Sequence, residues 1–151
     1  MLNAHTENTD GKRIALIYCR DHSGCSHVRL RYNTEYINGH ELGVEPVLLP
    51  FPTFDPALLS AAKSIVIQRP CVGTDIQLLK RYKELQPKFG FKLVGEFDDL
   101  IFYTGDSDES IDGVPPYNPG HANMKEHKDE IKAVLSQTLP LLDLIVVSTD
   151  Y

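Results

Sequence analysis

The sequence predicts a single α/β domain in which a parallel sheet is covered by helices on both faces. Short apolar runs alternate with stretches whose apolar residues recur at helical spacing, and this alternation is typical of parallel sheets. The 151 residues suit one domain with its own core, and 42% hydrophobic and 24% charged residues are ordinary for a globular chain. Residues 1–11 are polar and are expected to form a flexible tail, so the domain is expected to span residues 12–151.

Five short apolar runs are predicted to form the strands. The first, Ile14–Tyr18, is continuously apolar and flanked by charged residues, which is typical of a strand buried on both faces. The order of strands and helices predicts a Rossmann-like, doubly wound parallel sheet. The strands are expected near residues 13–18, 44–49, 64–68, 91–96 and 143–147.

The first helix is expected over residues 27–38. Val28, Tyr32 and Tyr36 follow one another at intervals of four, which predicts an apolar face built from these side chains. Gly39 is expected to end the helix as the residue beyond its C-cap, because glycine adopts the left-handed conformation needed there.

The later helices carry start signals of their own. Asp55 before Pro56 predicts an N-cap followed by proline at the first helical position. Thr74 with Gln77 matches a capping box. The helix that follows is expected to pack through Ile76, Leu79, Tyr82 and Leu85, and a last helix over residues 121–138 through Met124, Ile131, Val134 and Leu135.

Charge and hydropathy exclude several classes of protein. The net charge of −6 gives no basic footprint for nucleic acid or for an anionic membrane surface. No apolar run approaches the roughly 20 residues that a membrane-spanning helix needs. The polar N-terminus has no apolar core of a signal peptide, so a cytoplasmic protein is expected.

The three cysteines are expected to be reduced thiols, since their number is odd and no CxxC pair is present. Cys19, His22, Cys25 and His27 could be taken for a zinc site, because a tetrahedral zinc needs four such ligands. All four lie within one nine-residue segment between a buried strand and a helix, whereas structural zinc sites usually join two separated pairs. No zinc is therefore expected there.

The chemically interesting residues gather where strands are predicted to end. Doubly wound sheets bind ligands outside the carboxyl ends of their strands, and the segments 19–29, 68–74 and 96–104 converge there. The first is a turn with one glycine that feeds a helix N-terminus, which suits an anion or a sugar hydroxyl but lacks the GxGxxG pattern of dinucleotide sites. Asp98 and Asp99 could bind Mg²⁺ with a nucleotide or accept hydrogen bonds from sugar hydroxyls.

Several short motifs occur in a distinctive order between residues 13 and 149. They are the turn Ser23–Leu30, the strand with a final Gln-Arg step Ser64–Arg69, the acidic segment Phe97–Leu100 followed by Val114–Pro119, and the strand Leu142–Thr149. Together they resemble the N-terminal half of a GT-B glycosyltransferase of the group-1, family-4-like kind that is common in bacteria and large phages.

The resemblance implies transfer of a glycosyl group from a nucleotide sugar to the hydroxyl of a glycan or another acceptor. The N-terminal half would mainly shape the acceptor side, and neither a metal ion nor a cofactor beyond the nucleotide sugar is implied. Asp98 would act as the catalytic base or would orient the hydroxyl. The residues implied to bind substrate are Gly24, Cys25, Arg29, Arg69 and Asp99.

The chain departs from that family in two respects. The acidic run has two aspartates where three are common, and the second domain, which holds most nucleotide-sugar contacts in GT-B enzymes, is not among the 151 residues. A second domain or subunit is therefore an expected partner, and the isolated chain is expected to be inactive. The alternatives are a binding or scaffold module that kept the fold, and a Mg²⁺-dependent GT-A-type transferase that uses Asp98 and Asp99.

Overall fold

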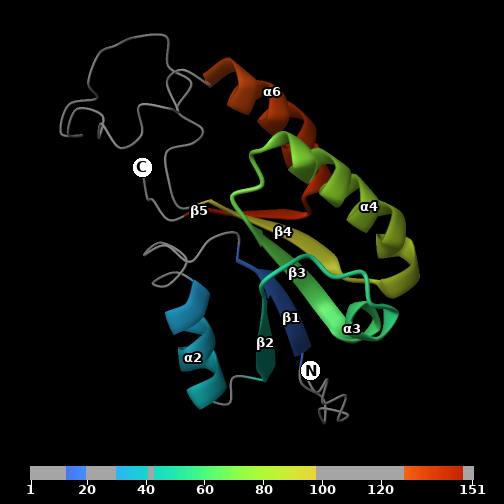
Figure 1. The fold of residues 1–151 in the computed structure, drawn as a ribbon. Helices are drawn as coiled ribbons and strands as arrows, with labels where there is room; N and C mark the ends of the chain where they lie inside the picture. Colours follow the sequence, from blue (N-terminus) through green and yellow to red (C-terminus); the bar gives the residue numbers. More distant parts are fainter. Residues whose placement is uncertain (1–12, 20–29, 41–42, 98–127, 148–151) are drawn as a thin grey trace, which may run out of the picture.

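The computed structural model describes residues 13–19, 30–40, 43–97 and 128–147. Strands and helices alternate along these ranges (Figure 1). The elements are β1 (Arg13–Tyr18), α2 (Tyr32–Gly39), β2 (Val44–Leu49), α3 (Pro56–Ala61), β3 (Ala62–Gln68), α4 (Gly73–Phe89), β4 (Lys92–Phe97), α6 (Lys128–Thr138), the short 3-10 helix η3 (Leu139–Leu141) and β5 (Leu144–Val147).

The five strands form one sheet in the order β2-β1-β3-β4-β5, and every neighbouring pair is parallel. The predicted Rossmann-like α/β fold and all five predicted strand positions are confirmed. The order is one of the two common orders of doubly wound sheets, and its direction reverses between β1 and β3. Ligands of such sheets bind at that reversal, outside the carboxyl ends of the strands.

One face of the sheet is covered by α3, α4 and α6. Leu59 of α3 and Leu79 and Tyr82 of α4 pack with residues of β1, β3 and β4, while Leu135 of α6 packs on Phe97 of β4. Burial raises the pKa of the Tyr82 hydroxyl to about 12, and this hydroxyl donates a 3.0 Å hydrogen bond to the Thr53 carbonyl. The predicted inward faces are thus confirmed for Leu79, Tyr82 and Leu85 of α4 and for Ile131, Val134 and Leu135 of α6, whereas Ile76 is partly buried outside these clusters.

The opposite face carries a smaller cluster beside α2. Ile17 and Cys19 pack there with Leu30, which precedes the helix, and with Leu48 and Val66. Figure 1 shows α2 on one side of the sheet and α4 and α6 on the other. Because parallel strands are joined by right-handed crossovers, a link that turns back along the sheet must change face. Among the described helices, α2 therefore lies apart from α3, α4 and α6.

The predicted face and end of α2 are wrong. Tyr32 and Tyr36 are exposed, Tyr36 at 59%, whereas Leu30 and Thr34 are buried. Thr34 can be buried because its hydroxyl donates a 2.6 Å hydrogen bond to the Leu30 carbonyl, which satisfies its polar group. Gly39 is the last residue of the helix, not the residue beyond its cap, and His40 is the C-cap. Val28 lies outside the described residues.

Local capping signals are otherwise reproduced, with one shift. Asp55 caps α3, and its carboxylate accepts a 2.9 Å hydrogen bond from the Ala57 N–H. The predicted start of α4 at Thr74 is wrong by two residues, because Val72 is the N-cap and the Asp75 carboxylate accepts a 2.8 Å hydrogen bond from its N–H. Asp75 reaches the N-cap from the third helical position, as a carboxylate in a capping box does.

The two edge strands, β2 and β5, differ in sequence and in exposure. Pro46 lies in β2, where an edge position suits a residue that has no N–H to donate to a neighbour. At the other edge, all four residues of β5 are apolar and exposed, between 41% and 56%. The described helices therefore bury β1, β3 and β4 far more completely than β5.

Gly95 allows β4 to pack closely against the segment before β5. A Cβ at this position would lie 2.5 Å from Leu142 Cδ1 and 3.0 Å from Phe97 Cε2. We expect Gly95→Ala to lower the free energy of unfolding by about 1 kcal/mol, at the lower end for overpacking because the end of the Leu142 side chain can move. Denaturant unfolding of both proteins measures the difference.

Gly73→Ala is the matched control. A Cβ on Gly73, in the first turn of α4, would meet no atom within 4 Å. Alanine should leave stability unchanged or raise it by up to about 1 kcal/mol, because it restricts the unfolded chain more than glycine does. Equal effects of the two substitutions would contradict the packing role of Gly95.

Candidate functional site

The carboxyl edge of the central strands carries two buried polar residues side by side. Gln68 ends β3 and is paired in register with Glu96 of β4, and their exposed fractions are 0% and 4%. Both lie on the face of Val66 and Leu30, since side chains two residues apart along a strand share a face. A carboxyl group and an amide so deeply buried next to a reversal in strand order are unusual for a simple core.

The turn that follows β3 is tightly held. The Arg69 N–H donates to the Glu96 carbonyl at 2.7 Å, and the Cys71 N–H donates to the Arg69 carbonyl across Pro70, also at 2.7 Å. Arg69 has a φ of 44°, the one positive value among the non-glycine residues that the structure describes. An L-residue in this region costs roughly 1–2 kcal/mol, so the surrounding contacts must hold it there.

A small pocket of about 110 Å³ opens at the carboxyl ends of β1 and β2. It is lined by Cys19, Arg31, Leu48, Leu49 and Pro50. Pockets that enclose drug-sized ligands span about 300–1,000 Å³, so this one suits a single functional group of a ligand. Arg31 supplies a positive charge in otherwise mostly apolar walls.

Of the six predicted site residues, Arg69 falls within the described ranges. It is half-buried and lies at the carboxyl edge next to the reversal between β1 and β3, as the sequence predicts for a ligand-binding position. Gly24, Cys25, Arg29, Asp98 and Asp99 lie outside the described residues, so their predicted roles remain predictions. The same holds for the proposed proximity of Arg29 and Asp98.

Sequence reasoning missed Arg31 and the partnership of Gln68 with Glu96. The two polar side chains become neighbours through the register of β3 and β4, which no local pattern encodes. Arg31 joins the pocket because it precedes α2 and lines the pocket together with the end of β2, and these two segments are separated in the chain by the whole of α2. A signal did exist for Glu96, since a charged residue in a predicted buried strand calls for an explanation.

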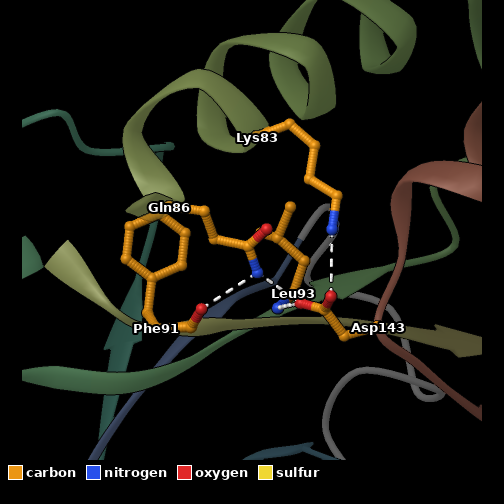
Figure 2. A network of polar contacts seen from close by, with 5 residues as sticks. All are labelled: Lys83, Gln86, Phe91, Leu93 and Asp143. Atoms are coloured by element: carbon orange, nitrogen blue, oxygen red, sulfur yellow. Dashed lines mark hydrogen bonds and ion pairs between the residues drawn. The ribbon is translucent and has the colours of Figure 1, made fainter. Parts of the chain in front are cut away.

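Asp143 lies at the opposite, amino edge of the sheet and has a structural role. Its carboxylate accepts hydrogen bonds from the Leu93 N–H at 2.7 Å, from Lys83 Nζ at 2.9 Å and from Gln86 Nε2 (Figure 2). The Asp143 N–H donates to the Leu93 carbonyl at 2.8 Å, and Gln86 Nε2 also donates to the Phe91 carbonyl at 2.9 Å. This network joins α4 to the starts of β4 and β5.

The ionisation of Asp143 follows from the same contacts. Burial acts to raise the pKa of its carboxyl, but the hydrogen bonds from Leu93, Lys83 and Gln86 and the positive charge of Lys83 together hold it below its ordinary value of 3.8. The ionised form is therefore the one that the folded chain favours.

The predicted absence of zinc is not tested, because only Cys19 of its four residues is described. Within the described ranges, no three His, Cys, Asp or Glu residues gather closely enough to hold a metal ion. None of the helices in those ranges combines the length and apolar character that crossing a membrane requires.

Comparison of the chain with protein-family models, with curated proteins and with solved structures finds no match.

The backbone of Arg69 can be tested separately from its side chain. Arg69→Gly and Arg69→Ala both remove the guanidinium, but only glycine adopts a φ of 44° without strain. We expect the glycine variant to be more stable than the alanine variant by about 1 kcal/mol in denaturant unfolding.

The same pair of substitutions at Lys80 should give the opposite order. Lys80 is exposed within α4, where glycine costs about 1 kcal/mol relative to alanine. If Arg69→Ala were more stable than Arg69→Gly, the result would contradict the left-handed backbone conformation of residue 69.

Asp143→Asn is expected to lower the free energy of unfolding at pH 7 by about 1 kcal/mol, because the variant loses the charge that strengthens the contacts with Lys83 and Leu93. Since the pKa of Asp143 is lower in the folded than in the unfolded chain, its ionised form stabilises the fold above the unfolded pKa near 3.8. This contribution is lost as the pH falls through the folded pKa.

Unfolding of both proteins at several pH values provides the measurement. The difference between wild type and Asp143→Asn should be constant at neutral pH and should shrink below about pH 4. Glu84→Gln is the control, because Glu84 pairs with Arg81 on the exposed side of α4 and should contribute less than about 0.5 kcal/mol. A difference that persists unchanged at acid pH would contradict the role assigned to the Asp143 charge.

Proposed function

We propose that this chain is the acceptor-side half of a glycosyltransferase that transfers a sugar from a nucleotide sugar to an acceptor hydroxyl. The observation that carries the proposal is the position of the Gln68-Arg69 step. In the resemblance described above, this step ends a strand, and here Gln68 ends β3 and Arg69 follows it, beside the reversal between β1 and β3. Ligands of doubly wound sheets bind at that place.

The proposed reaction is the transfer of a glycosyl group to an acceptor hydroxyl. The oxygen of the acceptor hydroxyl forms a bond to the anomeric carbon of the donor sugar, the bond from that carbon to the nucleoside diphosphate breaks, and the diphosphate leaves with the electron pair. The hydroxyl proton passes to a base, for which Asp98 is proposed because it directly follows β4 in the sequence. Arg69, Asp99, Gly24, Cys25 and Arg29 are proposed to bind substrate.

The size of the pocket favours a second candidate, a module that binds a ligand without transferring it. A nucleotide sugar is much larger than the pocket of about 110 Å³ beside Arg31. Rate enhancement by positioning and preorganised charge needs groups on more than one side of the reacting atoms. The described residues supply groups from the carboxyl edge of one sheet.

The isolated 151-residue chain is expected to fold cooperatively and to show no sugar transfer above background. Its sheet has its own core, so independent folding is physically reasonable. Nucleotide release from UDP-, GDP- and ADP-sugars, measured beside a thermal melt, provides the test. Addition of a second α/β domain, as a separate chain or fused, should produce transfer if the proposal holds.

Asp98→Asn distinguishes the mechanisms. Robust Mg²⁺-dependent turnover by the 151-residue chain alone, abolished in Asp98→Asn, would replace the proposal with the GT-A-type alternative. A folded chain that binds sugars but stays inactive with each added α/β domain would favour the alternative function, a binding module. A melt with no cooperative transition would contradict independent folding.

A further inference from the structure

The pocket at the ends of β1 and β2 combines a cationic residue with apolar walls. Arg31 provides a guanidinium, and Leu48, Leu49 and Pro50 provide apolar walls. An aromatic residue follows Arg31 in the sequence, and another follows Pro50. Phe51 directly follows Pro50 and is 74% exposed, and Tyr32 directly follows Arg31 and is also exposed.

The volume of the pocket limits what can enter it. About 110 Å³ holds a phosphate or carboxylate group, but not a sugar ring together with its substituents. Guanidinium is the side-chain group that matches these oxyanions best, because its planar N–H groups can donate two parallel hydrogen bonds. The rest of such a ligand would have to lie outside the pocket.

The inference assigns that remainder to Phe51. This residue directly follows the lining residue Pro50 in the chain, and it is 74% exposed. A sugar ring has an apolar face of C–H groups that packs well on aromatic rings, and contact with Phe51 removes apolar surface of both partners from water. A ligand with an oxyanion on a sugar ring would satisfy both parts of this surface.

We infer that the surface formed by Arg31, the pocket walls and Phe51 binds a monosaccharide that carries a single oxyanionic group. The oxyanion enters the pocket and pairs with Arg31, and the ring lies on Phe51. The ring part of this inference rests on the proposed sugar-handling function, and it assigns to the acceptor a phosphate ester or a carboxylate. The net charge of −6 opposes any anion, so binding depends on the local charge of Arg31 and weakens with salt.

The experiment titrates the isotope-labelled 151-residue chain with four small probes and monitors binding by NMR, without donor sugar. Glucose 1-phosphate and glucuronate should both shift the signals of Cys19, Arg31 and Phe51, and comparing them identifies which oxyanion is preferred. Uncharged glucose and inorganic phosphate should each bind at least about tenfold more weakly, because each lacks one of the two contacts. Equal binding of inorganic phosphate would contradict the part assigned to Phe51.

Variants separate the two contacts. Arg31→Gln should weaken both charged sugars about tenfold, whereas Arg31→Lys should retain part of the affinity because it keeps the charge. Phe51→Ala should weaken the charged sugars but leave inorganic phosphate unchanged. Arg81→Gln on the exposed side of α4 is the control and should bind as the wild type does.

The inference is overturned if Arg31→Gln binds as tightly as the wild type, or if no probe shifts these signals in the folded wild-type chain. Its failure is distinct from failure of the proposed transferase, because binding is measured without donor and without turnover. A chain that binds charged sugars through Arg31 but never transfers sugar retains this site as a binding module. Transfer by a chain that binds neither of the charged sugars would retain the transferase and contradict this site.

Discussion

The parallel direction of all five strands is the constraint from which the other features of this fold follow. Two parallel neighbours cannot be joined by a tight hairpin, so each link must cross back over the sheet, and each crossover is right-handed. The link from β1 to β2 runs one way along the sheet and the later links run the other way. This reversal separates α2 from α3, α4 and α6, and it places the ends of β1 and β3 side by side where their helices diverge.

A crossover fixes the side on which a helix lies, but it does not fix how the last strand is aligned. That alignment depends on Asp143. Its backbone and its carboxylate both bond to Leu93, and the carboxylate also holds Lys83 and Gln86 of α4. β5 has little burial of its own, since all four of its side chains are exposed. Polar contacts at its start therefore compensate for apolar contacts that the described helices do not provide.

The sequence predicts the parts of this fold that depend on local pattern. The strands were predictable because their apolar runs are short and bounded, and the cap at Asp55 because its signal involves neighbouring residues. The buried face of α2 was not predictable, because a tyrosine ring suits either a core or a surface. Periodicity shows that residues share a face of a helix, but it does not show whether that face points to the core. Strand register pairs Gln68 with Glu96, and tertiary packing brings Arg31 to the end of β2. Of the described site, only Arg69 was therefore predictable.

The motifs of the glycosyltransferase resemblance do not all bear on function. Asp143 lies at the amino edge of the sheet, directly before β5, where its carboxylate is used in hydrogen bonds that hold the sheet together. Any protein with this sheet could use such a residue, so that motif supports the fold alone. Gln68 and Arg69 lie at the carboxyl edge, where Arg69 adopts a strained backbone conformation that the contacts of the turn hold in place. The proposed sugar-handling function therefore depends, among the described residues, on the carboxyl edge, at the turn after β3 and at the pocket beside Arg31.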